Sequence, residues 1–202
     1  MPNGYHSGMH DKTAKPAASA PPGGNTAGAE APLRLHIGGT ETKPGWKILN
    51  VQPGPDVDFV GDCIDLGRFA DGSVQEIYAS HVLEHLSYQD RLPRALGELY
   101  RVLSPGGVAM ISVPDLEVLC RLFLDPRAKV RDRFEIMRMA FGGQMDPHDF
   151  HFVGLSYDLL YNFLFGAGFR RIEQVKAFGL FRDSSTIEYM GEPISLNVVA
   201  HK

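Results

Sequence analysis

The sequence predicts an α/β fold built on a mostly parallel sheet that is covered on both faces. Short apolar, strand-like segments alternate with segments whose apolar residues recur at helical spacing. Turns rich in glycine, proline and aspartate separate these segments. Alternation of this kind is typical of parallel sheets with crossover helices. The 202 residues are enough for one domain with a sizeable core.

The first 32 residues differ in composition from the rest of the chain. Residues 1–32 are rich in proline, glycine and alanine and hold almost no large apolar side chain. Such a segment cannot bury enough apolar surface to offset the entropy lost on ordering. We therefore expect a disordered tail over residues 1–32 and a single domain over residues 33–202.

Four strands are expected in the first part of this domain, over residues 33–37, 46–51, 57–60 and 74–80. Each is short and apolar and ends at a glycine, proline or aspartate turn or, for the fourth, at the HVLEH segment. The first two strands are joined by residues 38–45 alone, which is too short for a crossover helix. The sequence therefore predicts no helix between strands one and two.

The second part of the domain holds most of the expected helices. Apolar residues at helical spacing predict a helix from Leu92 to Leu103, capped by Asp90 and ended by the turn of residues 104–107. A fifth strand, three helices and two closing strands are then expected, over residues 108–113, 116–124, 130–141, from Ser156 to Gly166, 169–178 and 194–201. The last two strands lack a good helix between them, which favours an antiparallel edge hairpin. Aromatic residues in their link suggest a dimer surface or a lid over the site: Phe178, Phe181 and Tyr189.

Composition narrows the location and the partners. The formal net charge of −4 gives no global basic field for nucleic acid, and the basic cluster of residues 127–138 is expected on a solvated helix face. Cys63 and Cys120 are too few for a disulfide framework. No signal peptide and no membrane-spanning run is recognised. The expected location is the cytoplasm.

Five motifs in fixed order give the chain a family resemblance. LHIGGT, PGWKILNV, VDFVGDCIDL, EIYASHVLEHL and LYRVLSPGG, read in this order, are similar to bacterial type 11-like methyltransferases. The resemblance covers residues 33–202 and implies the Rossmann-like class I fold, with a seven-stranded sheet of order 3-2-1-4-5-7-6. It also implies S-adenosylmethionine (SAM) as cofactor, held at the carboxyl ends of the strands where the order reverses.

The resemblance assigns cofactor contacts to the ends of the first four strands. The turn after strand one meets the methionine part, the end of strand two the ribose, the end of strand three the adenine, and strand four the sulfonium. The residues at these positions are His36, Gly38, Gly39, Gln52, Asp62, Cys63, Ser80 and His81. Asp62 has the alternative role of capping the next turn. The sequence departs from the family pattern at five positions where acidic residues or glycines are usual. The residues at these positions are His36, Thr40, Thr42, Gln52 and Gln75.

Histidines give the candidates for acid–base chemistry. His81 follows strand four, and His148 and His151 lie in the loop MDPHDFH that the resemblance places over the acceptor. An imidazole titrates near neutral pH and can accept a proton from a hydroxyl or amine. The same residues have structural alternatives: a polar lining for His81 and loop hydrogen bonds for the other two.

HVLEH (residues 81–85) also spells H-x-x-E-H, a zinc motif of peptidases. In that motif two histidines on one helix face bind zinc and the glutamate acts as base. Candidate third ligands are His148, Asp149 and His151, but none is convincing from the sequence, and we expect no metal site.

The sequence therefore predicts a SAM-dependent methyltransferase for the oxygen or nitrogen of a small-molecule or glycan-related acceptor. It is expected to be a monomer or homodimer with no nucleic-acid partner. Two alternatives remain: a binding or scaffold protein that keeps the fold without the chemistry, and a metal-dependent hydrolase that uses HVLEH.

Overall fold

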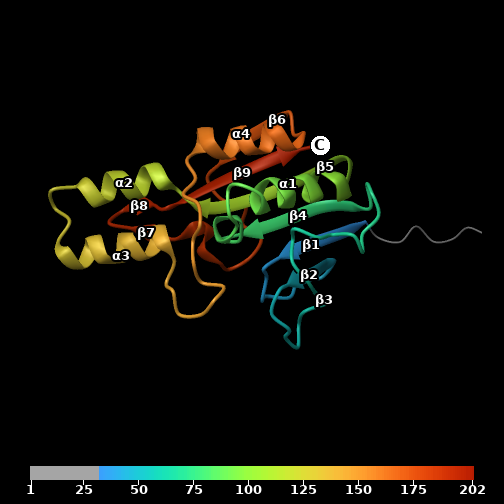
Figure 1. Cartoon of the computed structure of the whole chain (residues 1–202), viewed down its shortest axis with the longest axis horizontal. Coiled ribbons are helices and arrows are strands. Elements are labelled where there is room, and N and C mark those ends of the chain that lie inside the picture. The colour runs from blue at the N-terminus through green and yellow to red at the C-terminus, as the bar shows by residue number, and fades with distance from the viewer. Residues whose placement is uncertain (1–31) are drawn as a thin grey trace, which may run out of the picture. The chain divides into compact units, whose positions relative to one another are not determined.

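The computed structural model describes residues 32–202, so the tail predicted over residues 1–32 lies outside the described part except for Pro32. A seven-stranded sheet of order β3-β2-β1-β4-β5-β9-β6 forms its centre (Figure 1). Strands β1 to β5 run parallel, and β9 is antiparallel to both β5 and β6. The sheet strands are β1 (Leu33–Ile37), β2 (Trp46–Asn50), β3 (Phe59–Val60), β4 (Val74–Ser80), β5 (Leu103–Pro114), β6 (Arg171–Val175) and β9 (Ser195–His201).

This order confirms the predicted topology, with β9 as the seventh sheet strand along the chain. The sequence did not predict the short hairpin of β7 (Glu188–Tyr189) and β8 (Glu192–Pro193) that precedes it. Strand β5 begins at Leu103, so the predicted turn of residues 104–107 is an irregularity inside the strand, with Gly106 at φ 79°. As predicted, residues 38–45 form no helix between β1 and β2.

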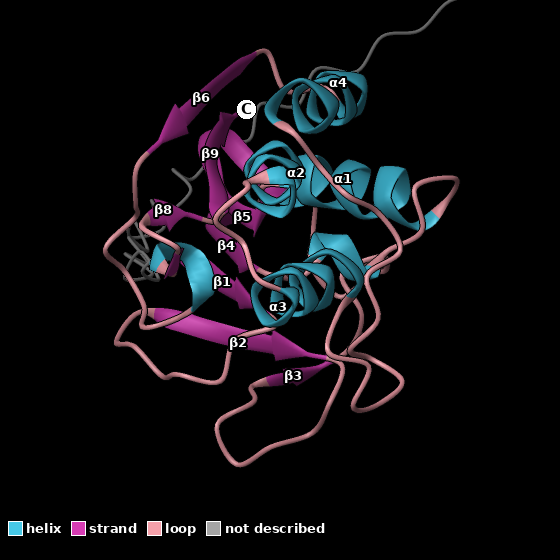
Figure 2. Cartoon of the chain, turned by 90° about the vertical axis from the view of Figure 1, so that its left-hand side faces the viewer, coloured by secondary structure: helices cyan, strands magenta, loops and turns pink. Residues whose placement is uncertain are grey.

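Helices α1 (Arg91–Val102) and α4 (Tyr157–Ala167) pack on one face of the sheet (Figure 2). The strands direct alternate side chains to this face, so the helices cover a continuous apolar layer. The pair α2 (Leu116–Leu124) and α3 (Val130–Phe141) lies beyond the carboxyl ends of β4 and β5 (Figure 1). The buried side chains of the main core include Leu35, Ile77, Leu96, Leu99, Ile111, Leu160, Leu164 and Val198.

Among residues 32–202, no α-helix covers the opposite face over β1 and β4. Residues 176–187, which we call the cover segment, lie there instead. Phe181 of this segment packs against His36 of β1 and Tyr78 of β4, with ring centroids 3.9 Å and 4.9 Å away. The Tyr78 hydroxyl donates to Asp183 Oδ2 at 2.6 Å, and Asn197 Nδ2 donates to two carbonyls of the segment. Polar and aromatic side chains on this face of the sheet therefore hold the segment in place.

The connection between β1 and β2 holds the cover segment from the other side. Lys43 Nζ donates to the carbonyl oxygen of Leu180 at 3.0 Å, and the amide of Arg182 donates to Glu41 Oε2 at 2.8 Å. A segment far along the chain thus covers the surface that a β1–β2 helix would otherwise occupy. The aromatic residues between the last two predicted strands had suggested a dimer surface or a lid over the site. In the structure, Phe178 and Phe181 pack on the sheet instead. Tyr189 packs with α2 and α3.

Candidate active site

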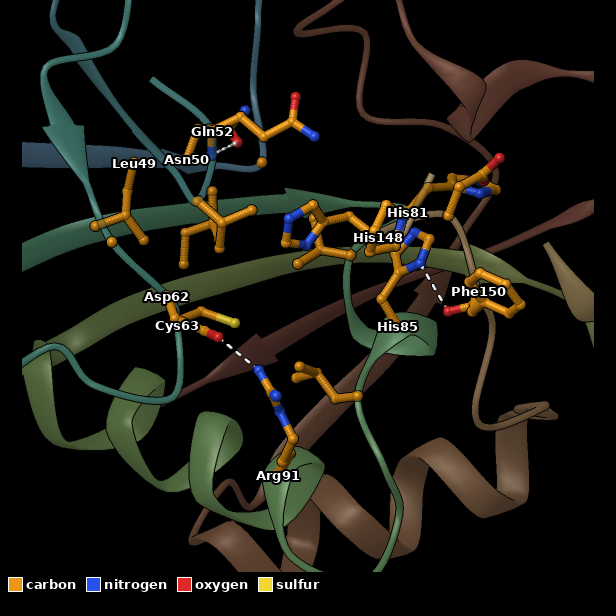
Figure 3. A pocket seen from close by; sticks show the side chains of 18 of the residues that line it. Leu49, Asn50, Gln52, Asp62, Cys63, His81, His85, Arg91, His148 and Phe150 are labelled. Atoms are coloured by element: carbon orange, nitrogen blue, oxygen red, sulfur yellow. Dashed lines mark hydrogen bonds and ion pairs between the residues drawn. The ribbon is translucent and has the colours of Figure 1, made fainter. Parts of the chain in front are cut away.

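A cavity of about 740 Å³ opens at the carboxyl ends of β1 to β4 (Figure 3). Its volume lies in the usual range for small-molecule and cofactor sites. One wall comes from the segments that follow these strands, and the other comes from the loop before α4. The lining residues are Ile37, Gly38, Leu49, Asn50, Val51, Gln52, Gly61, Asp62, Cys63, His81, Val82, His85, Leu86, Arg91, Asp146, Pro147, His148, Asp149, Phe150 and Phe152.

The turn after β1 brings backbone to the cavity wall at Gly38. Its φ of 72° lies in the left-handed region that favours glycine, and its amide donates to the carbonyl oxygen of Leu49 at 2.8 Å. A Cβ atom at this position would come within 2.5 Å of Val82 Cγ2, so the turn has no room for a side chain. Gly38 therefore sits where the sequence predicted it.

Gly39 and His36 do not line the cavity. A Cβ atom on Gly39 would collide with the His36 ring, so this glycine makes room for that side chain. The His36 ring points to the cover segment, and burial lowers its pKa below the usual value. His36 alternates with Leu35 and Ile37, which face the helices, and it must therefore face the other way. The structure does not bring His36 to the predicted cofactor site.

At the end of β2, Asn50 organises two backbone segments. Its side-chain amide donates to the carbonyl oxygen of Gly39 at 3.1 Å and accepts from the amide of Gln52 at 3.0 Å. The side chain of Gln52 is exposed and lines the cavity, at the position expected to meet the ribose (Figure 3). The positioning role of Asn50 was not predicted from the sequence. An amide side chain at a strand end, able to donate and to accept, was the available signal.

After β3, Asp62 lies at the cavity wall in an ion pair with the first residue of α1. Arg91 Nη2 is 2.5 Å from Asp62 Oδ2, while Asp62 Oδ1 accepts from the amide of Ile64 at 3.1 Å. Asp62 thus both caps the next turn and lines the cavity. Cys63 beside it is buried, which raises its pKa to about 12, so the thiol is neutral at physiological pH. The role of Arg91 was not predicted from the sequence, because no local sequence pattern links it to Asp62.

His81 follows β4 with a left-handed φ of 54°. The Ser195 hydroxyl donates to the carbonyl oxygen of Ser184 at 2.8 Å, so it accepts from His81 Nε2 at 3.0 Å. The other ring nitrogen, Nδ1, is 3.2 Å from Glu84 Oε1. The ring is therefore held by the hydrogen bond at Nε2, while Nδ1 lies against the Glu84 carboxylate without a hydrogen bond of good geometry, and this suits a positioned polar lining. The predicted neighbour Ser80 does not line the cavity, and its hydroxyl is buried.

The loop before α4 separates its two histidines. His148 is exposed at the cavity wall (Figure 3), with its amide donating to Asp146 Oδ1 at 2.7 Å. His151 lies outside the cavity lining, where its Nδ1 pairs with the carbonyl oxygen of Met139 at 3.0 Å. Asp149 accepts from the amides of Gly143 and Met145 and so closes the loop on itself.

The H-x-x-E-H geometry of zinc peptidases is not formed by HVLEH. Only Leu83–His85 are helical, in a single 3-10 turn (η1). His81 precedes this turn and is directed to Ser195, so it shares no helix face with His85. The metal-dependent hydrolase alternative therefore lacks the pair of histidine ligands on one helix face that it requires.

Comparison with known proteins agrees with the fold. Residues 39–111 match the family model described as a methyltransferase domain. No curated protein sequence shows significant similarity to the chain. Among solved structures, a SAM-dependent methyltransferase from Archaeoglobus fulgidus is similar at 17% identity and a TM-score of 0.54, over 86% of this chain and 87% of that one.

Two further structures have the same fold. A putative methyltransferase of Haloferax volcanii, solved in complex with the activator Trm112, has 16% identity and a TM-score of 0.51, over 85% of this chain and 83% of that one. A putative O-methyltransferase from Nostoc punctiforme has 11% identity and a TM-score of 0.52, over 86% and 53%. The chain therefore has the class I fold of SAM-dependent methyltransferases, its residues 39–111 match a methyltransferase domain, and S-adenosylmethionine is the cofactor that this domain implies.

Proposed function

We propose that the protein is a SAM-dependent methyltransferase acting on the oxygen or nitrogen of a small-molecule or glycan-related acceptor. The observation that carries the proposal is the cavity at the carboxyl ends of β1 to β4, where the strand order reverses between β1 and β4. Ligands of open α/β sheets bind at this switch point. Residues 39–111, which match the methyltransferase domain, include β2, β3 and β4 of these four strands.

The residues at the cavity fit the parts of the cofactor. The turn at Gly38 presents backbone to the methionine part, and the amide of Gln52 can bond to ribose hydroxyls from the end of β2. Asp62 and the backbone beside Cys63 lie where the adenine edge is expected. Because Gln52 is neutral, its bonds are weaker than those of the carboxylate usual at this position.

When bound, SAM would supply an electrophilic methyl group attached to a sulfonium sulfur, and the leaving group of the transfer would be the neutral thioether. The protein then has to align the acceptor with that carbon and exclude competing water. In our proposal the acceptor lies toward the wall made by His81, His148, Phe150 and Phe152. His148 can take the proton of a hydroxyl acceptor, because it is exposed at this wall. His81, held by Ser195 and Glu84, orients the acceptor.

Labelled methyl transfer tests this function. SAM with a labelled methyl group is incubated with sugars, lipid-linked sugars and amines. We expect turnover on one of these classes, and His148→Gln should lower kcat on a hydroxyl acceptor by about 100-fold, the lower range of a general base. The same assay with Phe134→Ala, an exposed residue of α3, serves as control. SAM binding without turnover on any class would instead support the scaffold alternative.

The proposal also includes the cellular location and the oligomeric state of the protein. Within residues 32–202, no helix has the length and apolar character needed to cross a bilayer. Neither Cys63 nor Cys120 forms a disulfide. We propose a cytoplasmic bacterial enzyme that works as a monomer or homodimer, without nucleic acid as partner.

A further inference from the structure

Beside the cavity, three potential metal ligands from two parts of the chain lie together. Glu84 and His85 belong to η1, and His151 belongs to the loop between α3 and α4. One ligand atom from each lies within 4.8 Å of the others. The rings of the two histidines meet edge to face, with centroids 4.8 Å apart. Two imidazoles and a carboxylate form a donor set that zinc and ferrous ions use in proteins.

The carboxylate of this group is buried without compensation by hydrogen bonds. Glu84 is 1% exposed, and within residues 32–202 neither of its side-chain oxygens has a hydrogen-bond partner of good geometry. His81 Nδ1 lies 3.2 Å from Oε1. Burying a carboxylate without hydrogen bonds is strongly unfavourable, and a bound cation would offset this cost.

The two histidines are oriented as metal-binding histidines are. His85 Nδ1 pairs with the carbonyl oxygen of Phe150 and His151 Nδ1 with that of Met139, both at 3.0 Å. A carbonyl oxygen only accepts, so each Nδ1 carries the hydrogen and the lone pair of the neutral ring is on Nε2. Such outer hydrogen bonds commonly fix the tautomer of ligating histidines.

We propose that Glu84, His85 and His151 bind one divalent transition-metal ion of the zinc type. Tetrahedral zinc ligands lie about 3.3 Å apart, given bonds of about 2.0–2.1 Å. The ligand atoms, which lie up to 4.8 Å apart, must therefore approach one another by up to about 1.5 Å. The position of His151 in a loop allows such a movement. The bound ion joins this loop to the exit of β4, next to the cavity wall. In the H-x-x-E-H motif the ligands would be His81 and His85. The proposed set keeps His85 and has Glu84 and His151 in place of His81. It also departs from the sequence-based prediction of no metal site.

Metal content of the full-length protein tests the proposal. The chelator-stripped protein is equilibrated with Zn²⁺ alone, and the bound metal is measured by elemental analysis after gel filtration. We expect one zinc per chain, with an affinity that falls at least tenfold in His151→Gln and in His85→Gln. His201→Gln, at the far end of β9, is the matched histidine control and should bind zinc as the wild type does. Circular dichroism checks that each variant is folded.

Substitution of Co²⁺ for zinc supplies a readout that needs no variant. The wild-type protein is expected to show the strong visible absorption of four- or five-coordinate cobalt with nitrogen and oxygen ligands. Absence of stoichiometric zinc, a weak six-coordinate cobalt spectrum, or zinc binding that both histidine variants leave unchanged would overturn the proposal. None of these readouts depends on methyl transfer, so a failure here leaves the proposed function untouched.

Discussion

Replacing Phe181 by alanine is expected to lower the free energy of unfolding by about 3–5 kcal/mol, the usual loss for a buried aromatic residue. Phe181 is 9% exposed and contacts His36, Trp46 and Tyr78, which together form the aromatic layer on the face opposite α1. The cavity left by the ring cannot collapse easily, because β1, β2 and β4 are fixed by the sheet. The loss also weakens the anchoring of the whole cover segment.

Urea unfolding followed by circular dichroism measures this effect. Phe134→Ala is the matched control, because Phe134 is 55% exposed on α3, and it should change stability by no more than about 0.5 kcal/mol. A loss below about 1 kcal/mol in Phe181→Ala, against the expected range for a buried ring, would show that the cover segment does not seal this face.

Gly38→Ala is expected to weaken binding of S-adenosylhomocysteine at least tenfold, or about 1.4 kcal/mol. The left-handed φ of 72° costs a residue with a side chain about 1–2 kcal/mol. The new methyl group would also meet Val82 Cγ2 at 2.5 Å, and Val82 itself lines the cavity. Either the turn or Val82 has to move, and both movements change the cavity wall.

Calorimetric titration of the two glycine variants separates this effect from a general loss of stability. Gly97→Ala is the control, since in residues 32–202 no atom outside its chain neighbours and its own helix backbone lies within 4 Å of the position of its Cβ. Alanine is the better helix former there, so this variant should keep the wild-type affinity with equal or higher stability. Wild-type affinity in Gly38→Ala would mean that the turn after β1 does not contact the cofactor.

Much of the fold could be predicted from local patterns. The helical spacing of Leu92, Ala95, Leu96 and Leu99 gave α1 within a few residues, and the short connection of residues 38–45 ruled out a helix. The cover segment could not be predicted in this way. Its contacts join residues far apart in the chain, such as Lys43 with Leu180. The periodic patterns of a sequence do not indicate contacts of this kind.

The site was predictable where it depends on strand ends, and less so elsewhere. Gly38, Gln52, Asp62, Cys63, His81 and His148 all reach the cavity wall, because parallel strands end at one edge of the sheet. His36 was assigned by family position, although strand alternation with Leu35 and Ile37 already placed it on the other face. The meeting of His151 with Glu84 and His85 depends on how the loop folds back, which the sequence does not show.

Calorimetric titration of SAM and S-adenosylhomocysteine into the purified wild-type protein tests the central claim most directly. We expect one binding site per chain with a dissociation constant of about 1 μM, equivalent to about −8 kcal/mol, and a matching rise in thermal stability. No heat and no thermal shift with either compound at millimolar concentration would contradict it, and the cavity at the ends of β1 to β4 would then need a different ligand.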